Sequence, residues 1–225
     1  MLINIIYKLS RYTLEDGEMK KILDLSQKIY NNMPVHPYDE KAVVEQNRYI
    51  NKDNYSNTQI SVGMHVGTHI DSPRHLIDDG KRIDQYNLSH FMGKACVIDV
   101  FGEKIIQLKE EYKEKIRSSE IVLLYTGYGD YFEKAEYYSE NAPVLSNEFA
   151  EYLVKKQIKI IGMDLPSPDR YPFEVHKILL SNDVLIIENL NNLEKLLDKK
   201  HFGFYAMPLN IDAEASLTRA IAVVE

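Results

Sequence analysis

The chain has 225 residues, of which 44% are hydrophobic and 27% charged, so its composition excludes an intrinsically disordered protein. Its formal net charge of −7 argues against nucleic acid as a main partner, because phosphate binding needs a basic surface. No apolar run approaches the roughly 20 residues of a membrane span, and the single cysteine, Cys96, rules out an intrachain disulfide. We therefore expect a cytoplasmic protein that binds neither nucleic acid nor a membrane.

The beginning of the chain separates into two parts. Residues 1–18 are predicted to be an N-terminal extension or arm, because Asp16-Gly17 is a turn signal and a new strand pattern starts near Met19. Residues 19–225 are then expected to form one domain, since this length suits a single core.

Downstream, short apolar or alternating stretches outnumber helical patterns. Strands are predicted over residues 22–26, 29–30, 42–50, 58–64, 95–100, 121–125, 158–164, 184–188, 202–209 and 220–224. Helices are predicted over residues 108–116, 146–156 and 174–181, with a helical turn or two over 190–197. The strand–helix–strand unit over 121–164 implies a parallel pairing with a crossover. The expected fold class is therefore α/β, a single domain with a mixed β-sheet core.

One short segment concentrates the residues that bind first-row metals. His65, His69, Asp71 and His75 lie within eleven residues. On a straight strand His65 and His69 would be about 13 Å apart, whereas two nitrogens on one metal lie within about 4 Å of each other. The segment must therefore bend if it binds metal, and Gly67 is the residue at which a bend costs least.

A second group of polar residues follows later apolar strands. Asp164 and Asp169 lie after one predicted strand, His176 in a short helix, and Glu188 at the end of another strand. Buried carboxylates at strand ends need a partner, and a metal ion is one. Glu188 and His176 are therefore candidates to complete the first cluster.

The sequence His65-Val66-Gly67-Thr68-His69-Ile70-Asp71-Ser72-Pro73-Arg74-His75 resembles a signature of the cyclase family of metal-dependent hydrolases. This family includes bacterial kynurenine formamidase (arylformamidase) and the isatin hydrolases. Weaker resemblances occur on both sides of this segment, in the same order as in the family, at residues 22–26, 33–35, 123–127, 162–169, 176 and 187–190. The resemblance covers nearly all of the chain after residue 20 and implies the family's ββα layering.

The resemblance implies a role for each site residue. His65, His69 and Asp71 would bind a first metal ion, and Asp71 and Glu188 would bridge to a second ion that His176 also binds. The expected cofactor is one or two Zn²⁺ ions, with Mn²⁺ as the alternative. His75 would be the catalytic proton shuttle and not a ligand. A homodimer or homotetramer is also implied.

One departure from the family concerns the substrate. Kynurenine formamidases carry a tryptophan in the early loop that stacks on the aromatic substrate, but this chain has no tryptophan. His36 occupies the nearest position and becomes the candidate substrate-binding residue.

The expected function is metal-dependent hydrolysis of an amide-type C–N bond, as in arylformamidase. Activated water would attack the carbonyl, and His75 would transfer the proton. One alternative is a cyclic amide (isatin-type) or lactone hydrolase with a single Mn²⁺ or Zn²⁺. An alternative of another class is a non-catalytic protein that binds a metal or small molecule.

Overall fold

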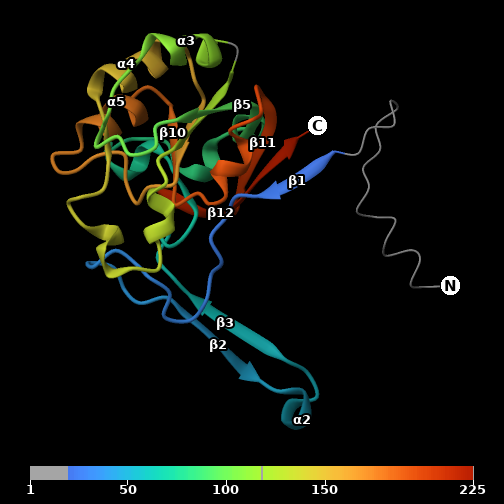
Figure 1. The fold of residues 1–225 in the computed structure, drawn as a ribbon. Coiled ribbons are helices and arrows are strands. Elements are labelled where there is room, and N and C mark those ends of the chain that lie inside the picture. Colours follow the sequence, from blue (N-terminus) through green and yellow to red (C-terminus); the bar gives the residue numbers. More distant parts are fainter. Residues whose placement is uncertain (1–19, 118, 225) are drawn as a thin grey trace.

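An eight-stranded mixed sheet forms the framework of the protein (Figure 1). The structure is a computed structural model that describes residues 20–117 and 119–224. The strands of this sheet are β1 (Lys21–Asp24), β4 (His69–Asp71), β5 (Met92–Asp99), β7 (Ile121–Tyr125), β9 (Ile160–Met163), β10 (Leu185–Glu188), β11 (Phe202–Pro208) and β12 (Ala215–Val224). Their order is β1-β12-β11-β5-β7-β9-β10-β4, and β4 also pairs with β12, so the sheet closes into a barrel-like ring.

Two pairs of strands lie outside this sheet, and helices connect the rest. The strand pairs are β2 (Val43–Arg48) with β3 (Asn57–Ser61), and β6 (Ile105–Ile106) with β8 (Val144–Leu145). The α-helices are α2 (Ile50–Asp53), α3 (Glu110–Arg117), α4 (Asn147–Lys155) and α5 (Glu174–Leu180). The 3-10 helices are η1 (Pro73–His75), η2 (Ile83–Gln85), η3 (Leu88–Phe91), η4 (Tyr128–Tyr131), η5 (Ala135–Tyr138) and η6 (Leu193–Leu196).

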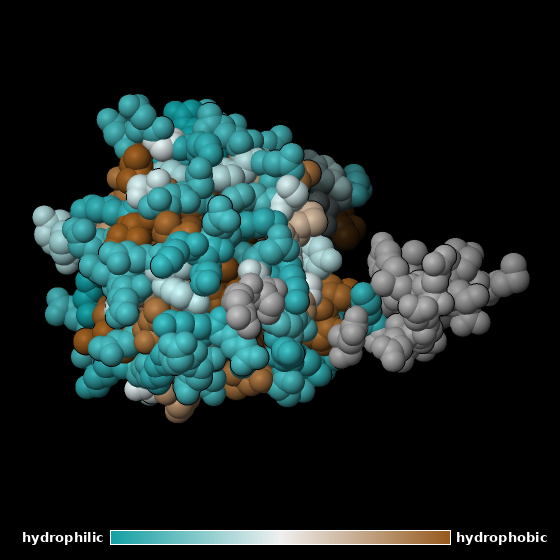
Figure 2. Space-filling view, turned by 90° about the horizontal axis from the view of Figure 1, so that it is seen from above, coloured by the Kyte–Doolittle hydropathy of each residue, from teal (hydrophilic) through white to brown (hydrophobic). Residues whose placement is uncertain are grey.

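The central strands are apolar on both faces because both faces are covered. In β7, Ile121 and Leu123 belong to the core enclosed by the sheet, whereas Val122 and Leu124 pack in the core that includes residues of α3, α4 and α5. The three helices lie together on one side of the sheet (Figure 1). Seen from that side, the surface is mainly hydrophilic and is broken by separate hydrophobic patches (Figure 2). Continuous apolar strands are therefore expected here, and the predicted mixed α/β fold is confirmed.

The predicted helix over 146–156 forms as α4 and connects two parallel strands. The Ser146 side chain caps it by accepting a hydrogen bond from the Phe149 N–H at 3.3 Å. Phe149, Ala150 and Leu153 are buried on its inner face. Strands β7 and β9, before and after it, are parallel, which confirms the predicted crossover.

Some boundaries differ from the sequence prediction. Residues 29–30 form no strand. Strand β12 begins at Ala215 and not at Ala220, because its first half pairs with β4 and its second half with β1. Strands β2 and β3 form an exposed hairpin that extends away from the sheet (Figure 1).

Some predictions remain outside what the structure describes. The arm at residues 1–18 lies outside the described residues, and the division at residue 19 stays a prediction, as does the homodimer or homotetramer. In the part of the chain that is described, no helix is long and apolar enough to cross a membrane.

Candidate metal centre

The segment from His65 to Asp71 bends at the predicted glycine. Gly67 has a φ of 65°, in the left-handed region, and a Cβ there would lie 2.7 Å from the Ile29 Cδ1 atom. After this turn, residues from His69 onward form β4, which the sequence did not predict. The bend brings the His65 and His69 rings to a centroid separation of 5.0 Å. The bend therefore brings both rings to the Asp71 carboxylate.

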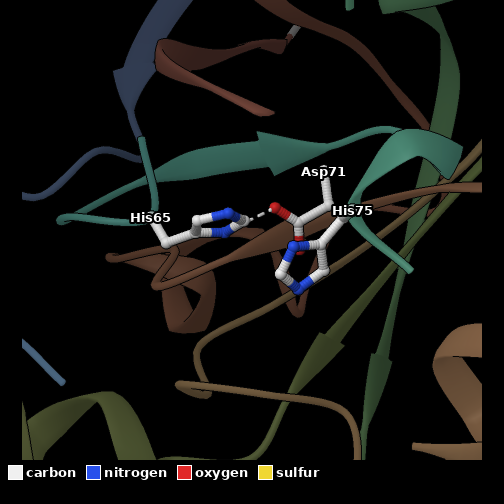
Figure 3. A group of neighbouring side chains, drawn as sticks. All are labelled: His65, Asp71 and His75. Carbon is white, nitrogen blue, oxygen red and sulfur yellow. Dashed lines mark ion pairs between the residues drawn. The ribbon is translucent and has the colours of Figure 1, made fainter. Parts of the chain in front are cut away.

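Asp71 lies at the centre of the cluster and is buried. Its Oδ1 atom is 3.0 Å from His65 Nδ1 and 3.5 Å from His69 Nε2. Figure 3 shows the Asp71 carboxylate facing His65, with His75 beside them. Asp71 belongs to two groups whose ligand atoms lie within 4.8 Å of one another, one with His65 and His75 and one with His69 and Glu188. A carboxylate shared in this way can bridge two ions.

The distant residues reach the cluster through sheet register and one helix. Glu188 pairs directly with His69 because β10 and β4 are antiparallel neighbours, and its Oε2 atom lies 3.4 Å from His69 Nε2. His176 Nε2, from α5, lies 3.5 Å from Glu188 Oε1. The other nitrogen of His176, Nδ1, is 2.5 Å from Asp169 Oδ1. Asp169 also accepts the backbone N–H groups of Val175 and His176, so it fixes both the helix start and the ring.

Hydrogen bonds fix the tautomer of His69. Its Nδ1 lies 2.9 Å from the Gly67 carbonyl oxygen, which can only accept, so Nδ1 carries the proton and Nε2 faces the carboxylates. The same carbonyl accepts a hydrogen bond from Asn189 Nδ2 at 2.9 Å. Thr68 Oγ1 donates to the Asn189 carbonyl oxygen at 2.7 Å. Thr68 therefore joins the turn to the residue after Glu188.

The electrostatics of the cluster favour a positive charge. Burial opposes charged imidazoles, but Asp71 outweighs it and raises the pKa of His65 to about 9. Burial is likewise outweighed at His176, where hydrogen bonds to Asp169 and Glu188 raise the pKa to about 10. Burial disfavours the charged Asp71, yet the neighbouring histidines hold its pKa below the usual range. A bound cation would replace protons at this site.

Unpartnered polar atoms also fit a metal ion. Among the described residues, four buried side-chain N or O atoms have no hydrogen-bond partner, and three of them are His69 Nε2, Asp71 Oδ1 and Asp71 Oδ2. Buried polar atoms normally have partners because leaving them unpaired is unfavourable. Imidazole nitrogen and carboxylate oxygen are ligands for Zn²⁺ and Mn²⁺. The donor set therefore fits the metal centre that the resemblance implied.

His75 lies close to the proposed ligands but differs from them electrostatically. Its ring centroid is 4.3 Å from that of His65 and 5.9 Å from that of His176. Burial holds the pKa of His75 below its usual value, so the imidazole is neutral at pH 7. A neutral imidazole can accept a proton. The same geometry also places His75 within reach of a metal ion, so its assignment as a non-ligand stays a prediction.

The structure brings the five proposed ligands and His75 together, whereas His36 packs elsewhere, against Tyr38 and Tyr138. The sequence did not assign three residues that support the cluster: Asp169, Asn189 and Glu214. Glu214 Oε1 lies 3.4 Å from His65 Nε2. The position of Asp169 in a polar motif after a predicted strand could have indicated its role beside the cluster. Glu214 precedes a strand whose pairing with β4 no local pattern indicates.

Comparison with known proteins gives consistent results. A family model described as "Putative cyclase" matches residues 23–170. A kynurenine formamidase from Bacillus cytotoxicus is 30% identical over 88% of this chain and 95% of its own. An uncharacterized protein from Methanocaldococcus jannaschii is 33% identical over 91% of this chain and all of its own.

Solved structures show the same fold. An isatin hydrolase bound to the product analogue thioisatinate superposes with a TM-score of 0.83 at 21% identity, covering 99% of this chain and 97% of that one. The family model covers most of the chain, including the whole segment from His65 to His75. On these grounds the chain belongs to the family described as "Putative cyclase".

Proposed function

We propose that this protein is a metal-dependent hydrolase that cleaves an amide-type C–N bond, as an arylformamidase does. The observation that carries the proposal is the convergence of unpartnered imidazole and carboxylate atoms on Asp71, beside the neutral His75. Kynurenine formamidases at about 30% identity over most of their length support the same reaction class.

In the proposed reaction, the protein holds metal through His65, His69 and Asp71, with Asp71, Glu188 and His176 available for a second ion. Bound metal would polarise a carbonyl group and lower the pKa of water to about 7. His75 accepts the proton of the attacking water and returns it to the leaving nitrogen.

Neighbouring groups keep the histidines in position during this reaction. The Gly67 carbonyl orients His69, and Asp169 orients His176.

The substrate is proposed to be an aromatic or cyclic amide that stacks on His36. His36 contacts the rings of Tyr38 and Tyr138, with centroid separations of 5.4 and 5.7 Å. An imidazole offers a smaller stacking surface than the indole of the formamidases. We therefore propose arylformamides as the class, without assigning N-formylkynurenine as the physiological substrate.

A single-ion cyclic amide or lactone hydrolase is the second candidate. The fold similarity to an isatin hydrolase, at a TM-score of 0.83, favours it. The two candidates differ in the number of ions and in the bond that is cleaved.

Metal analysis separates these candidates. We expect protein purified without added metal to contain about two equivalents of Zn²⁺ or Mn²⁺, because Asp71 is shared between the two proposed ligand sets, and Glu188 and His176 complete the second. His176→Ala should reduce the content to about one equivalent, since His65, His69 and Asp71 remain. A wild type that holds one equivalent, unchanged by His176→Ala, would favour the single-ion hydrolase.

A substrate panel tests the reaction class. The metal-loaded enzyme should hydrolyse formanilide and related arylformamides faster than lactams such as isatin, and faster than lactones. Faster turnover of isatin would instead assign the second candidate. No turnover of any member by a fully loaded protein would support the non-catalytic binding protein. Chelation by EDTA should abolish any true activity, and added Zn²⁺ or Mn²⁺ should restore it.

A further inference from the structure

A second unpartnered polar group lies apart from the histidines and carboxylates. The hydroxyl oxygen of Tyr138 is buried without a hydrogen-bond partner among the described residues. It is the only one of the four such atoms in that part of the chain that does not belong to His69 or Asp71. A buried hydroxyl normally finds a partner, because burying it unpaired is unfavourable. The other three atoms belong to the proposed metal centre, where a metal ion would be their partner. The partner of the Tyr138 hydroxyl has still to be identified.

Tyr138 connects the early loop with the strand that carries Glu188. Its ring packs edge-on against His36, with centroids 5.7 Å apart and planes at 89°. It packs in the same manner against Tyr137, at 5.1 Å and 84°. The Tyr137 hydroxyl in turn donates to Asn189 Oδ1 at 2.8 Å. Tyr138 therefore contacts the proposed substrate-stacking residue and also Tyr137, which is hydrogen-bonded to the residue after Glu188.

The chemistry of Tyr138 is that of a neutral donor. Burial, and then the negative charges of Glu188 and Asp39, hold the pKa of Tyr138 well above its usual value. The phenol therefore keeps its proton at neutral pH and needs an acceptor. The ring contact with His36 places Tyr138 beside the proposed substrate-stacking residue.

We propose that Tyr138 donates a hydrogen bond to a substrate oxygen other than the scissile carbonyl oxygen, and thereby sets substrate specificity. This inference rests on the proposed function. The scissile carbonyl would be polarised by metal held at the cluster around Asp71, which leaves the Tyr138 hydroxyl available to donate to a second oxygen of the substrate. The preferred substrate is then an aromatic amide that carries another oxygen acceptor close to the ring. His36 stacks on that ring, and the Tyr138 hydroxyl donates a hydrogen bond to the second oxygen.

Two adjacent tyrosines provide a matched pair of variants. Tyr138→Phe and Tyr137→Phe remove the same hydroxyl group from neighbouring residues. Within the described residues, the Tyr137 hydroxyl has a hydrogen-bond partner and the Tyr138 hydroxyl has none. Two substrates provide the second comparison: 2′-formamidoacetophenone, with a carbonyl ortho to the formamide, and formanilide, without one. The metal-loaded wild type and both variants are compared on both substrates.

Tyr138→Phe is expected to lower kcat/KM for 2′-formamidoacetophenone by about 10-fold to 100-fold, since the acceptor oxygen loses its donor. Formanilide should change by less than about 3-fold, because it never used that donor. Metal content and the thermal midpoint of the substrate-free enzyme should not fall. Tyr137→Phe should instead lower the thermal midpoint, because Asn189 Oδ1 is left buried without its donor.

Other results would overturn the assignment. Equal losses on both substrates, or none on either, would show that Tyr138 does not read a second oxygen. A midpoint lowered as much as in Tyr137→Phe would show that its hydroxyl has a structural partner. If the wild type hydrolyses neither compound, the proposed function fails separately. In that case, calorimetry measures the affinities of the wild type and Tyr138→Phe for 2-aminoacetophenone and for aniline. The proposal requires that Tyr138→Phe weaken the binding of 2-aminoacetophenone and leave that of aniline unchanged.

Discussion

Asp71→Ala is expected to abolish metal binding and hydrolysis together. The Asp71 carboxylate is the one group shared by both sets of candidate ligands, at 3.0 Å from His65 Nδ1 and 3.5 Å from His69 Nε2. The loss of metal affinity should therefore exceed the roughly 10- to 100-fold that removal of a supporting residue costs. Metal content after gel filtration and hydrolysis of an arylformamide measure the two effects.

Asp169→Asn is the matched control for this substitution. Asp169 orients His176 through a contact of 2.5 Å but belongs to neither ligand group. Its replacement should weaken metal affinity by about 10- to 100-fold and leave the number of ions unchanged at saturating metal. Asp71→Asn, which keeps the side-chain shape and removes the charge, should behave like Asp71→Ala. Full metal content in either Asp71 variant would contradict the proposed centre.

The pH dependence of the stability of the EDTA-treated protein gives an independent test of the interaction between Asp71 and His65. The folded pKa of His65 is about 9, against 6.5 for an ordinary histidine. A raised pKa stabilises the folded state below pH 6.5, and this stabilisation is lost as the pH rises toward 9. The Asp71→Asn protein should lose part of this decline, because Asp71 is the main cause of the shift. Chemical unfolding of both proteins at pH 6 and pH 9 measures this difference in the free energy of unfolding.

Much of the sheet and of the site could be predicted from local sequence. The run Ile121–Tyr125 is apolar at every position up to its final tyrosine, and a short run of this kind is typical of a strand covered on both faces. The need for a bend followed from distance, since an extended chain separates His65 and His69 too far for one ion. Its position at Gly67 followed from the conformational freedom of glycine. Its positive φ agrees with that argument. These predictions rest on periodicity and on the reach of the backbone, and both are properties of a few consecutive residues.

The features that the sequence did not predict depend on contacts between distant segments of the chain. No pattern within His69–Asp71 predicts a strand, because β4 exists only through its partners β10 and β12. The roles of Asn189 and Glu214 have the same origin: each contacts a residue more than 100 positions away, Gly67 and His65 respectively. Closure of the sheet creates these neighbours. Propensity and motif spacing describe single segments, and so they cannot reveal which segments the closed sheet joins.

His75→Ala is expected to keep the metal and lose most of the turnover. Burial keeps His75 neutral, so it can take a proton from water and return it to the leaving nitrogen. Loss of a general acid–base group typically costs about 10²- to 10⁴-fold in rate, and we expect kcat to fall by this amount. Metal content should match the wild type, since His65, His69, Asp71, His176 and Glu188 remain. Steady-state kinetics and metal analysis of one preparation measure both quantities.

His90→Ala is the matched control, because His90 contacts the Lys159 carbonyl oxygen at 3.3 Å and belongs to neither candidate ligand group. It should preserve both metal content and kcat. The comparison also decides between the two roles that the geometry allows His75, whose ring lies 4.3 Å from that of His65. A His75→Ala protein that loses about one equivalent of metal would make His75 a ligand. One that retains full activity would remove it from the mechanism altogether, and the proton would then have to travel through another group.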